Sequence, residues 1–170
     1  AFHGRTMATI SASANPKVQK GYEPLLSGFV QVELNDLSQL RDLCRSRDDL
    51  VAIMLEPIQG EAGIFQASDE YLKGIRSLCD EHSLLMICDE IQSGCGRTGA
   101  FLSYQHTDAA PDIVTIAKGL GNGFPVGACL ARGAASQVLK PGSHGSTFGG
   151  NPLASKAALT VLEQTQSLDR

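Results

Sequence analysis

Four short runs of almost continuous apolar residues stand out along the chain. They cover residues 50–55 (LVAIML), 84–88 (LLMIC), 113–117 (IVTIA) and 126–130 (VGACL). Runs of this length without apolar–polar alternation are typical of β-strands that are buried on both faces. The pattern therefore predicts four buried strands of one sheet.

Three other stretches repeat apolar residues at intervals of three and four, which is typical of amphipathic helices. They cover residues 36–47, the segment that follows Ser68 as helix cap, and the segment that opens on Asn151-Pro152, a cap followed by proline at the first helical position. Helices that alternate with buried strands predict an α/β fold. We expect a mainly parallel sheet with right-handed crossovers and helices on both faces.

Composition limits the classes of partner. The chain has 170 residues, of which 42% are hydrophobic, and this is enough for one sizeable core. Its formal net charge is -4, and no window gathers the Lys/Arg cluster that nucleic acid or an anionic membrane requires. No apolar stretch approaches 18 residues. We therefore expect neither nucleic acid nor a membrane as partner.

The cysteines indicate a reducing compartment. Their number, five, is odd, and no C-x-x-C pair occurs. Several lie in apolar runs, where cysteine behaves as a small hydrophobic residue. This pattern favours a cytoplasmic location and argues against a structural metal site.

Three of the predicted strands end in an ionisable residue. The first is followed by Glu56, the second by Asp89 and the third by Lys118. Ligands of open α/β sheets gather at the carboxyl ends of the strands. A single strand-end charge is usually solvated, but three at one edge beside glycine-rich loops indicate a site.

Lys118 leaves three alternatives open: a lysine that reaches water, a phosphate-binding loop, or a covalent catalyst. The G-x-G-x-G that follows it has Phe124 where a dinucleotide fingerprint needs glycine, and Pro125 prevents an immediate helix. In a P-loop the lysine follows the glycines, whereas Lys118 precedes them. Both phosphate-loop readings therefore fit poorly.

Covalent lysine chemistry needs an acidic partner if the cofactor is pyridoxal phosphate, which lysine holds as a Schiff base. Asp89 is the candidate partner for the pyridine nitrogen. Opposite charges about 4 Å apart at an effective dielectric near 20 interact by roughly 4 kcal/mol, enough to keep that nitrogen protonated. If the chain stays extended past Asp89, Ile91 lies on the same side and can pack beneath the ring.

The sequence resembles the class III, ornithine-type aminotransferases of the fold-type I pyridoxal phosphate enzymes. The resemblance covers essentially the whole chain and is closest to the acetylornithine branch. It rests on FHGRT (2–6), EPIQGEAG (56–63), DEIQSGCGRTG (89–99), PDIVTIAKGLGNGFPVGA (111–128) and HGSTFGGNPLA (144–154). Five motifs in family order are far more specific than any one alone.

The resemblance implies a cofactor site for pyridoxal 5'-phosphate. Lys118 would be the Schiff-base lysine and Asp89 the partner of the pyridinium nitrogen, which makes these two the catalytic residues. Phe2 and Ile91 would cover the two ring faces, and Gln92 would lie near the phenolic oxygen. The full set of implied cofactor-binding residues is Phe2, Asp89, Glu90, Ile91, Gln92, Lys118 and Thr147.

The resemblance also implies substrate-binding residues and a homodimer. Arg5 would clamp the substrate α-carboxylate, and Glu61 would interact with a second substrate-binding arginine that lies outside this chain. Ser146 would face substrate, and Thr147 would reach the cofactor phosphate of the neighbouring subunit. Each site would then borrow residues from its twin. The roles of His3 and His144 stay open.

In the family pattern, residues 1–170 form a partial large domain, with the phosphate-binding cup before FHGRT and a small domain after Arg170. The implied reaction is transamination of N2-acetylornithine, or a related ornithine derivative, with 2-oxoglutarate, in arginine biosynthesis. A 4-aminobutyrate or ornithine 5-aminotransferase is the alternative within the family. The alternative outside it is a noncatalytic α/β module or an inactive fragment.

Overall fold

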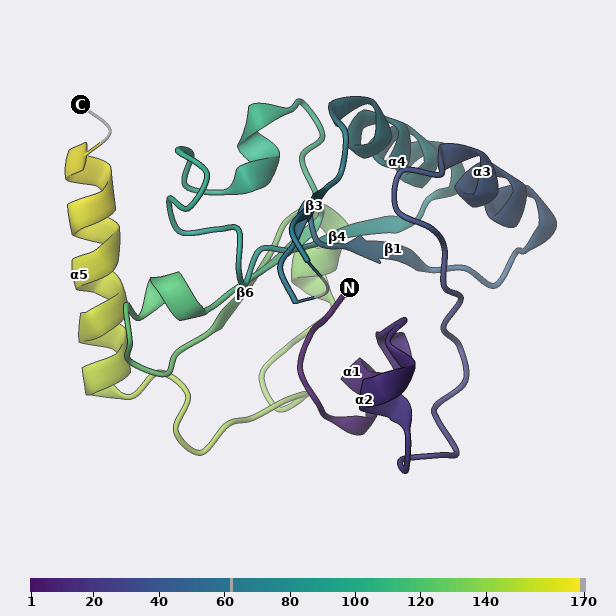
Figure 1. Ribbon diagram of the computed structural model, residues 1–170. Helices are drawn as coiled ribbons and strands as arrows, with labels where there is room; N and C mark the ends of the chain where they lie inside the picture. The colour runs from purple at the N-terminus through teal and green to yellow at the C-terminus, as the bar shows by residue number, and fades with distance from the viewer. Residues whose placement is uncertain (62, 169–170) are drawn as a thin grey trace.

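The computed structural model describes residues 1–61 and 63–168, which fold around one four-stranded sheet (Figure 1). The strands are β1 (Ala52–Leu55), β4 (Leu85–Asp89), β5 (Ile113–Ile116) and β6 (Ala128–Ala131), in the spatial order β1-β4-β5-β6. β4 is parallel to both β1 and β5, whereas β6 is antiparallel to β5. The prediction of four strands in a mainly parallel sheet is confirmed.

A second, two-stranded sheet was not predicted from the sequence. It pairs β2 (Ile58–Gln59) with β3 (Phe65–Gln66) in antiparallel register. Both strands have only two residues, so no hydrophobic period could have revealed them. This small sheet follows β1 directly, and it therefore shapes the loop that leaves the carboxyl edge of the main sheet.

The three predicted helices are present, with caps of the expected kind. They are α3 (Leu37–Ser46), α4 (Asp69–His82) and α5 (Pro152–Leu168). The Ser68 hydroxyl accepts the backbone N–H of Tyr71 at 3.1 Å, and Asn151 Oδ1 accepts that of Ala154 at 3.0 Å. Within the described residues, no helix is both long enough and apolar enough to cross a membrane.

The described part of the chain also holds five shorter helical segments, which were not predicted. α1 (Met7–Ala12) and α2 (Pro16–Gln19) are α-helical, and the other three are 3₁₀ turns, η1 (Ser103–His106), η2 (Lys118–Leu120) and η3 (Gly133–Gln137). Each has six residues or fewer, which is too short for a periodic apolar pattern. One of them, η2, begins at Lys118 in the site described below.

One face of the sheet carries the core. Leu55 pairs with Cys88, and Cys88 pairs with Val114, so these three side chains point to the same face. α3 and α4 cover β1 and β4 there, and α5 contributes Ala158 and Leu162 to the cluster around Val114. Fully buried side chains such as Ile75 and Met86 each stabilise the fold by roughly 1.5–3 kcal/mol.

The opposite face is covered less completely. Met54, Ile87 and Thr115 lie on it and are only half-buried. The N-terminal segment runs along this side, and Figure 1 shows α1 and α2 below the sheet while α3 and α4 lie above it. Long helices therefore shield one face, and short helices and loops leave the other accessible.

β6 corrects the prediction that all four strands are buried on both faces. All four of its residues are exposed, and Leu130 retains 43% of its surface. The apolar run was read as a buried strand because continuous apolar sequence is the usual mark of burial. Here β6 pairs with β5 only, and no helix of the described residues packs over it as α4 packs over β4.

An ion pair holds the amino-terminal end of β5. Asp112 Oδ2 accepts the backbone N–H of Met86 and Arg76 Nη1, both at 2.8 Å, and Arg76 also pairs with Asp80. Partial burial raises the pKa of Asp112, but the hydrogen bonds from Met86 and Arg76 outweigh it and hold that pKa below its usual value. This carboxylate ties α4 to the two central strands.

The five cysteines all lie within the described residues and form no disulfide. Cys44, Cys79 and Cys88 are buried, and burial raises the pKa of Cys79 to about 12. A thiol with so high a pKa stays protonated and acts as a small apolar group. Of the two cysteines in the predicted apolar strands, Cys88 is therefore part of the core, as expected, whereas Cys129 is exposed on β6 and corrects the expectation.

Candidate active site

The carboxyl edge of the sheet brings the three strand-end residues together in the predicted order. β1, β4 and β5 are adjacent and parallel, so Glu56, Asp89 and Lys118 all follow strands that end at this one edge. Asp89 is the last residue of β4 and pairs with Thr115, three residues before Lys118. The topology therefore brings the three strand-end residues to one edge, as the sequence predicted.

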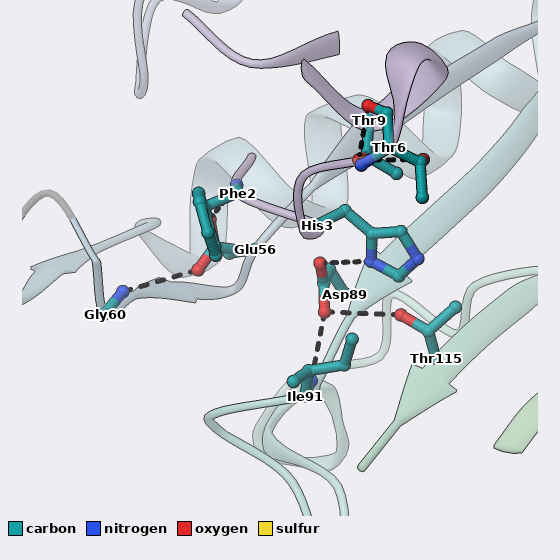
Figure 2. Close-up of polar contacts among 9 residues, drawn as sticks. All are labelled: Phe2, His3, Thr6, Thr9, Glu56, Gly60, Asp89, Ile91 and Thr115. Carbon is teal, nitrogen blue, oxygen red and sulfur yellow. Dashed lines mark hydrogen bonds and ion pairs between the residues drawn. The ribbon is translucent and has the colours of Figure 1, made fainter. Parts of the chain in front are cut away.

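Asp89 is a buried carboxylate with three hydrogen-bond donors, and Figure 2 shows how they surround it. It is 2% exposed. Its Oδ1 accepts the backbone N–H of Ile91 at 3.0 Å and the Thr115 hydroxyl at 3.3 Å, and its Oδ2 lies 2.8 Å from His3 Nδ1. Because a carboxylate offers about four acceptor positions, Oδ2 retains capacity for a further donor on the accessible face.

Lys118 has a backbone conformation that residues other than glycine rarely adopt. Its φ is 45°, in the left-handed region, at the start of η2. The side chain is exposed, in contrast to the buried Asp89. Non-glycine residues in this region concentrate at functional sites, where the surrounding structure enforces the strain. An accessible amine thus follows the strand that lies beside Asp89.

Glu56 is a site residue that the sequence argument did not select, although it was noted as a strand-end charge. It is 5% exposed and spans two loops (Figure 2). Its Oε1 accepts the backbone N–H of Phe2 at 2.7 Å, and its Oε2 accepts that of Gly60 at 3.3 Å. Glu56 therefore fastens the Phe2 loop to the sheet. The only signal in the sequence was its position after a buried strand.

Phe2 and His3 reach the sheet through a glycine turn. Gly4 has φ of 104°, a conformation that a residue with a Cβ rarely adopts, and Arg5 beyond it is exposed. The chain consequently turns its first residues toward Glu56 and Asp89 and directs Arg5 to solvent. Phe2 thus lies at the predicted edge. Within the described residues, Arg5 makes no hydrogen bond to Asp89.

Gln92 lies against the loop that leaves β1. A Cβ built on Gly60 would stand 2.5 Å from Gln92 Oε1, so a larger residue at position 60 would displace the Gln92 amide. Gln92 is half-buried. The structure thus places Gln92 beside the segment that Glu56 organises.

Ile91 requires a correction. Its position beneath a flat ring was expected on the condition that the chain stays extended past Asp89, and this condition is wrong. β4 ends at Asp89, and residues 91–98 form consecutive turns. The backbone N–H of Ile91 bonds Asp89 Oδ1, a local turn in which the aspartate side chain replaces a backbone acceptor. Ile91 therefore acts on Asp89 through its backbone, and its side chain is half-buried.

Glu90 is the second correction, because its carboxylate does not face the site. Glu90 is fully buried. Its Oε1 accepts the backbone N–H of Tyr104 at 2.9 Å, and its Oε2 accepts that of Ser103 at 2.8 Å and the Ser93 hydroxyl at 3.0 Å. The Glu90 carboxylate thereby satisfies the backbone N–H groups at the start of η1, on the helix-covered side of the sheet. The expectation that Glu90 binds cofactor conflicts with this arrangement.

The remaining predicted residues are exposed in loops. Glu61, Ser146 and Thr147 make no hydrogen bond to Asp89 or Glu56 within the part of the chain that the structure describes. Their predicted roles toward substrate and a neighbouring subunit therefore stay predictions. A surface hollow of about 800 Å³ lies elsewhere, at the start of β1 and β4, beside Leu50 and His82, and none of the predicted site residues lines it.

Comparison with known proteins establishes the family. The family model described as "Aminotransferase class-III" matches residues 1–169. An acetylornithine aminotransferase from Nitrosomonas europaea is 52% identical over 162 residues, which cover 95% of this chain and 41% of that protein. This chain belongs to the class-III aminotransferase family.

Solved structures agree with that assignment. The crystal structure of the ornithine aminotransferase from Toxoplasma gondii ME49 matches with a TM-score of 0.89 and 38% identity, and covers 99% of this chain and 41% of that one. A second Toxoplasma gondii ornithine aminotransferase structure, described as having partial occupancy of PLP at its active site, matches with a TM-score of 0.88 and 39% identity, over 98% of this chain and 40% of that one. The chain thus spans about two fifths of the length of the relatives it matches.

Proposed function

We propose that this chain is the central part of the large domain of a pyridoxal-phosphate-dependent aminotransferase. The observation that carries the proposal is that one sheet edge holds both a buried carboxylate, Asp89, and an exposed lysine with a strained backbone, Lys118. A phosphate-binding cup before residue 1 and a small domain after residue 170 complete the proposed protein, which is cytoplasmic; the five free cysteines support that location.

The residues at this edge fit the cofactor. Asp89 Oδ2 has acceptor capacity on the accessible face, where a protonated ring nitrogen can bind. The Lys118 amine is free to reach the cofactor carbonyl, and the Phe2 loop that Glu56 fastens can cover one face of the ring. Bound pyridoxal phosphate supplies an electron sink that makes the proton on the substrate Cα removable.

The chain's own groups then divide the work. Lys118 Nζ would hold the cofactor covalently and would accept the proton from the substrate Cα; acid–base catalysis of this kind contributes roughly 10²–10⁴-fold. Asp89 holds a proton on the ring nitrogen by charge attraction. Gln92, placed against Gly60, is available to the phenolic oxygen.

The proposed reaction transfers the amino group of N2-acetylornithine to 2-oxoglutarate. The relatives named acetylornithine aminotransferase support this choice, while the ornithine aminotransferase structures equally fit ornithine as donor. Arg5 would bind the substrate carboxylate through its guanidinium fork. Glu61 and Ser146 would line the substrate side. Thr147 would reach across a homodimer interface to the phosphate in the neighbouring subunit, which makes the dimer the active unit.

Replacing Lys118 tests the proposal. In the full-length protein, Lys118→Ala should lower the transamination rate by at least 10²–10⁴-fold, because the covalent and acid–base group is lost. Borohydride reduction followed by peptide mass spectrometry should find the cofactor on Lys118 in the unmodified protein and nowhere in the variant. Lys73→Ala, an exposed lysine of α4, is the matched control. A cofactor fixed to another lysine would refute the assignment.

Rates on a panel of amino donors then separate the substrates. We expect N2-acetylornithine to give the highest kcat/KM, with ornithine second. A preference for ornithine would replace the proposed substrate and keep the reaction class. A preference for 4-aminobutyrate would overturn the assignment to the ornithine branch.

A further inference from the structure

His3 makes a contact that the proposed function does not use. Its Nδ1 lies 2.8 Å from Asp89 Oδ2, across 86 positions of sequence. The His3 side chain is 28% exposed, whereas that of Asp89 is 2% exposed. Figure 2 shows the two side chains in contact. Because an ionised carboxylate only accepts hydrogen bonds, Nδ1 carries the proton in this contact.

This contact completes the hydrogen bonding of Asp89. Oδ1 is held by the Ile91 N–H and the Thr115 hydroxyl, and both of these donors belong to the sheet and its first turn. They fix one oxygen only, so the carboxylate plane could still tilt about it. The His3 donor holds the second oxygen from the N-terminal segment. Three donors on two oxygens define the orientation of the carboxylate.

The contact is not needed to hold the N-terminal loop. That loop is already tied to the sheet by the backbone N–H of Phe2, which donates to Glu56 Oε1 at 2.7 Å. The positive φ of Gly4 sets the turn that follows. Since the loop has its own anchor one residue away, the imidazole serves the carboxylate it touches.

We propose that His3 is a positioning residue, which orients Asp89 Oδ2 for the ring nitrogen of the cofactor. This inference rests on the proposed function, because it requires a cofactor whose ring nitrogen meets Asp89. His3 touches Asp89 directly and acts on the ring nitrogen only through it. Its effect should therefore depend on whether that nitrogen is present.

The test compares two cofactors in two variants of the full-length protein. His3→Phe keeps a planar ring but removes the donor, and His3→Asn keeps a donor near the position of Nδ1. We expect His3→Phe to weaken binding of pyridoxal phosphate by roughly 10- to 100-fold, the loss typical of a hydrogen bond to a charged group. His3→Asn should restore affinity to within about threefold of the unchanged protein.

The carbocyclic analogue 1-deazapyridoxal phosphate, in which the ring nitrogen is replaced by CH, gives the decisive comparison. With this analogue the unchanged protein and His3→Phe should bind within about twofold of each other, because Asp89 then has no ring nitrogen to meet. His106→Phe, which removes an imidazole contact to Thr98 far from Asp89, is the matched control and should leave both affinities unchanged.

Two results would overturn the inference. An equal loss for both cofactors would make His3 a general support of the fold, and no loss for either would make the contact inconsequential. If His3→Phe does not fold, His3→Leu, which also removes the donor, takes its place in the comparison of the two cofactors. Failure of the unchanged protein to bind pyridoxal phosphate would instead refute the proposed function.

Discussion

Asp89 and Glu90 are neighbours in the chain, yet their carboxylates belong to opposite sides of the sheet. Both are buried and both have three hydrogen-bond donors. Glu90 is surrounded on the helix-covered side by donors from η1 and the turn that precedes it. Asp89 lies on the accessible side, and one of its donors is an imidazole that another part of the chain supplies.

The two carboxylates differ in whether their hydrogen-bond partners can switch between donor and acceptor. Two of the three Glu90 donors are backbone N–H groups, which can never accept a hydrogen bond. At Asp89 Oδ2 the partner is His3, whose ring nitrogens exchange donor and acceptor roles with the tautomer. A buried carboxylate with fixed donors serves the fold, and one with an adaptable partner on an accessible face can serve a ligand.

The largest effect should come from Asp89→Asn. The amide NH₂ can replace Oδ2 and donate to His3 Nδ1 in its other tautomer, so the fold is kept while the charge is lost. An attraction of about 4 kcal/mol to the ring nitrogen corresponds to about 10³-fold in transamination rate. Steady-state rates and thermal unfolding of the full-length variant measure the two effects. A variant that stays active would place the ring nitrogen elsewhere.

Glu90→Gln should have the opposite effect: it should lower the stability of the fold rather than the transamination rate. Whichever way the amide is turned, its NH₂ faces at least one backbone N–H, of Ser103 or Tyr104, and leaves it unpaired. The free energy of unfolding should fall by about 1–3 kcal/mol, because a buried donor without a partner costs that much. Urea denaturation measures the loss. Unchanged stability together with weakened cofactor affinity would restore Glu90 to the site.

The smallest effect concerns Asp112, a third carboxylate at the other end of the sheet, paired with Arg76. Its pKa is lower in the folded protein, so it stabilises the fold above about pH 4 and loses this contribution as the pH falls through the folded value. Asp112→Asn should therefore be less stable than the unchanged protein at pH 7, and the gap should narrow toward pH 3. Urea midpoints across this range test it, and a constant gap would contradict an electrostatic origin.

The sequence predicted the elements with a strong period and the residues at their ends. The strands around Met86 and Val114 and the helix capped by Ser68 follow from local patterns. Asp89 and Lys118 follow from the rule that parallel strands share a carboxyl edge. These inferences needed only neighbouring residues and a general topology.

The remaining features depend on contacts between distant segments. Glu56 bonds Phe2 across 54 positions and His3 bonds Asp89 across 86, and no local pattern encodes such pairs. The extended backbone expected at Ile91 was wrong because the turn after Asp89 is made by a side-chain acceptor rather than by glycine or proline. The side of the sheet that the Glu90 carboxylate takes was not predicted because a sequence motif does not show which face each of its residues takes.

The left-handed backbone at Lys118 has an evolutionary consequence. Holding a non-glycine residue at φ of 45° costs on the order of 1–3 kcal/mol, and glycine at this position would avoid the cost. Glycine would also remove the amine. A sequence selected for stability alone would not retain lysine here. Under the proposed function, the strain at Lys118 marks a position where reactivity outweighs stability, and stabilising substitutions are better sought away from this edge.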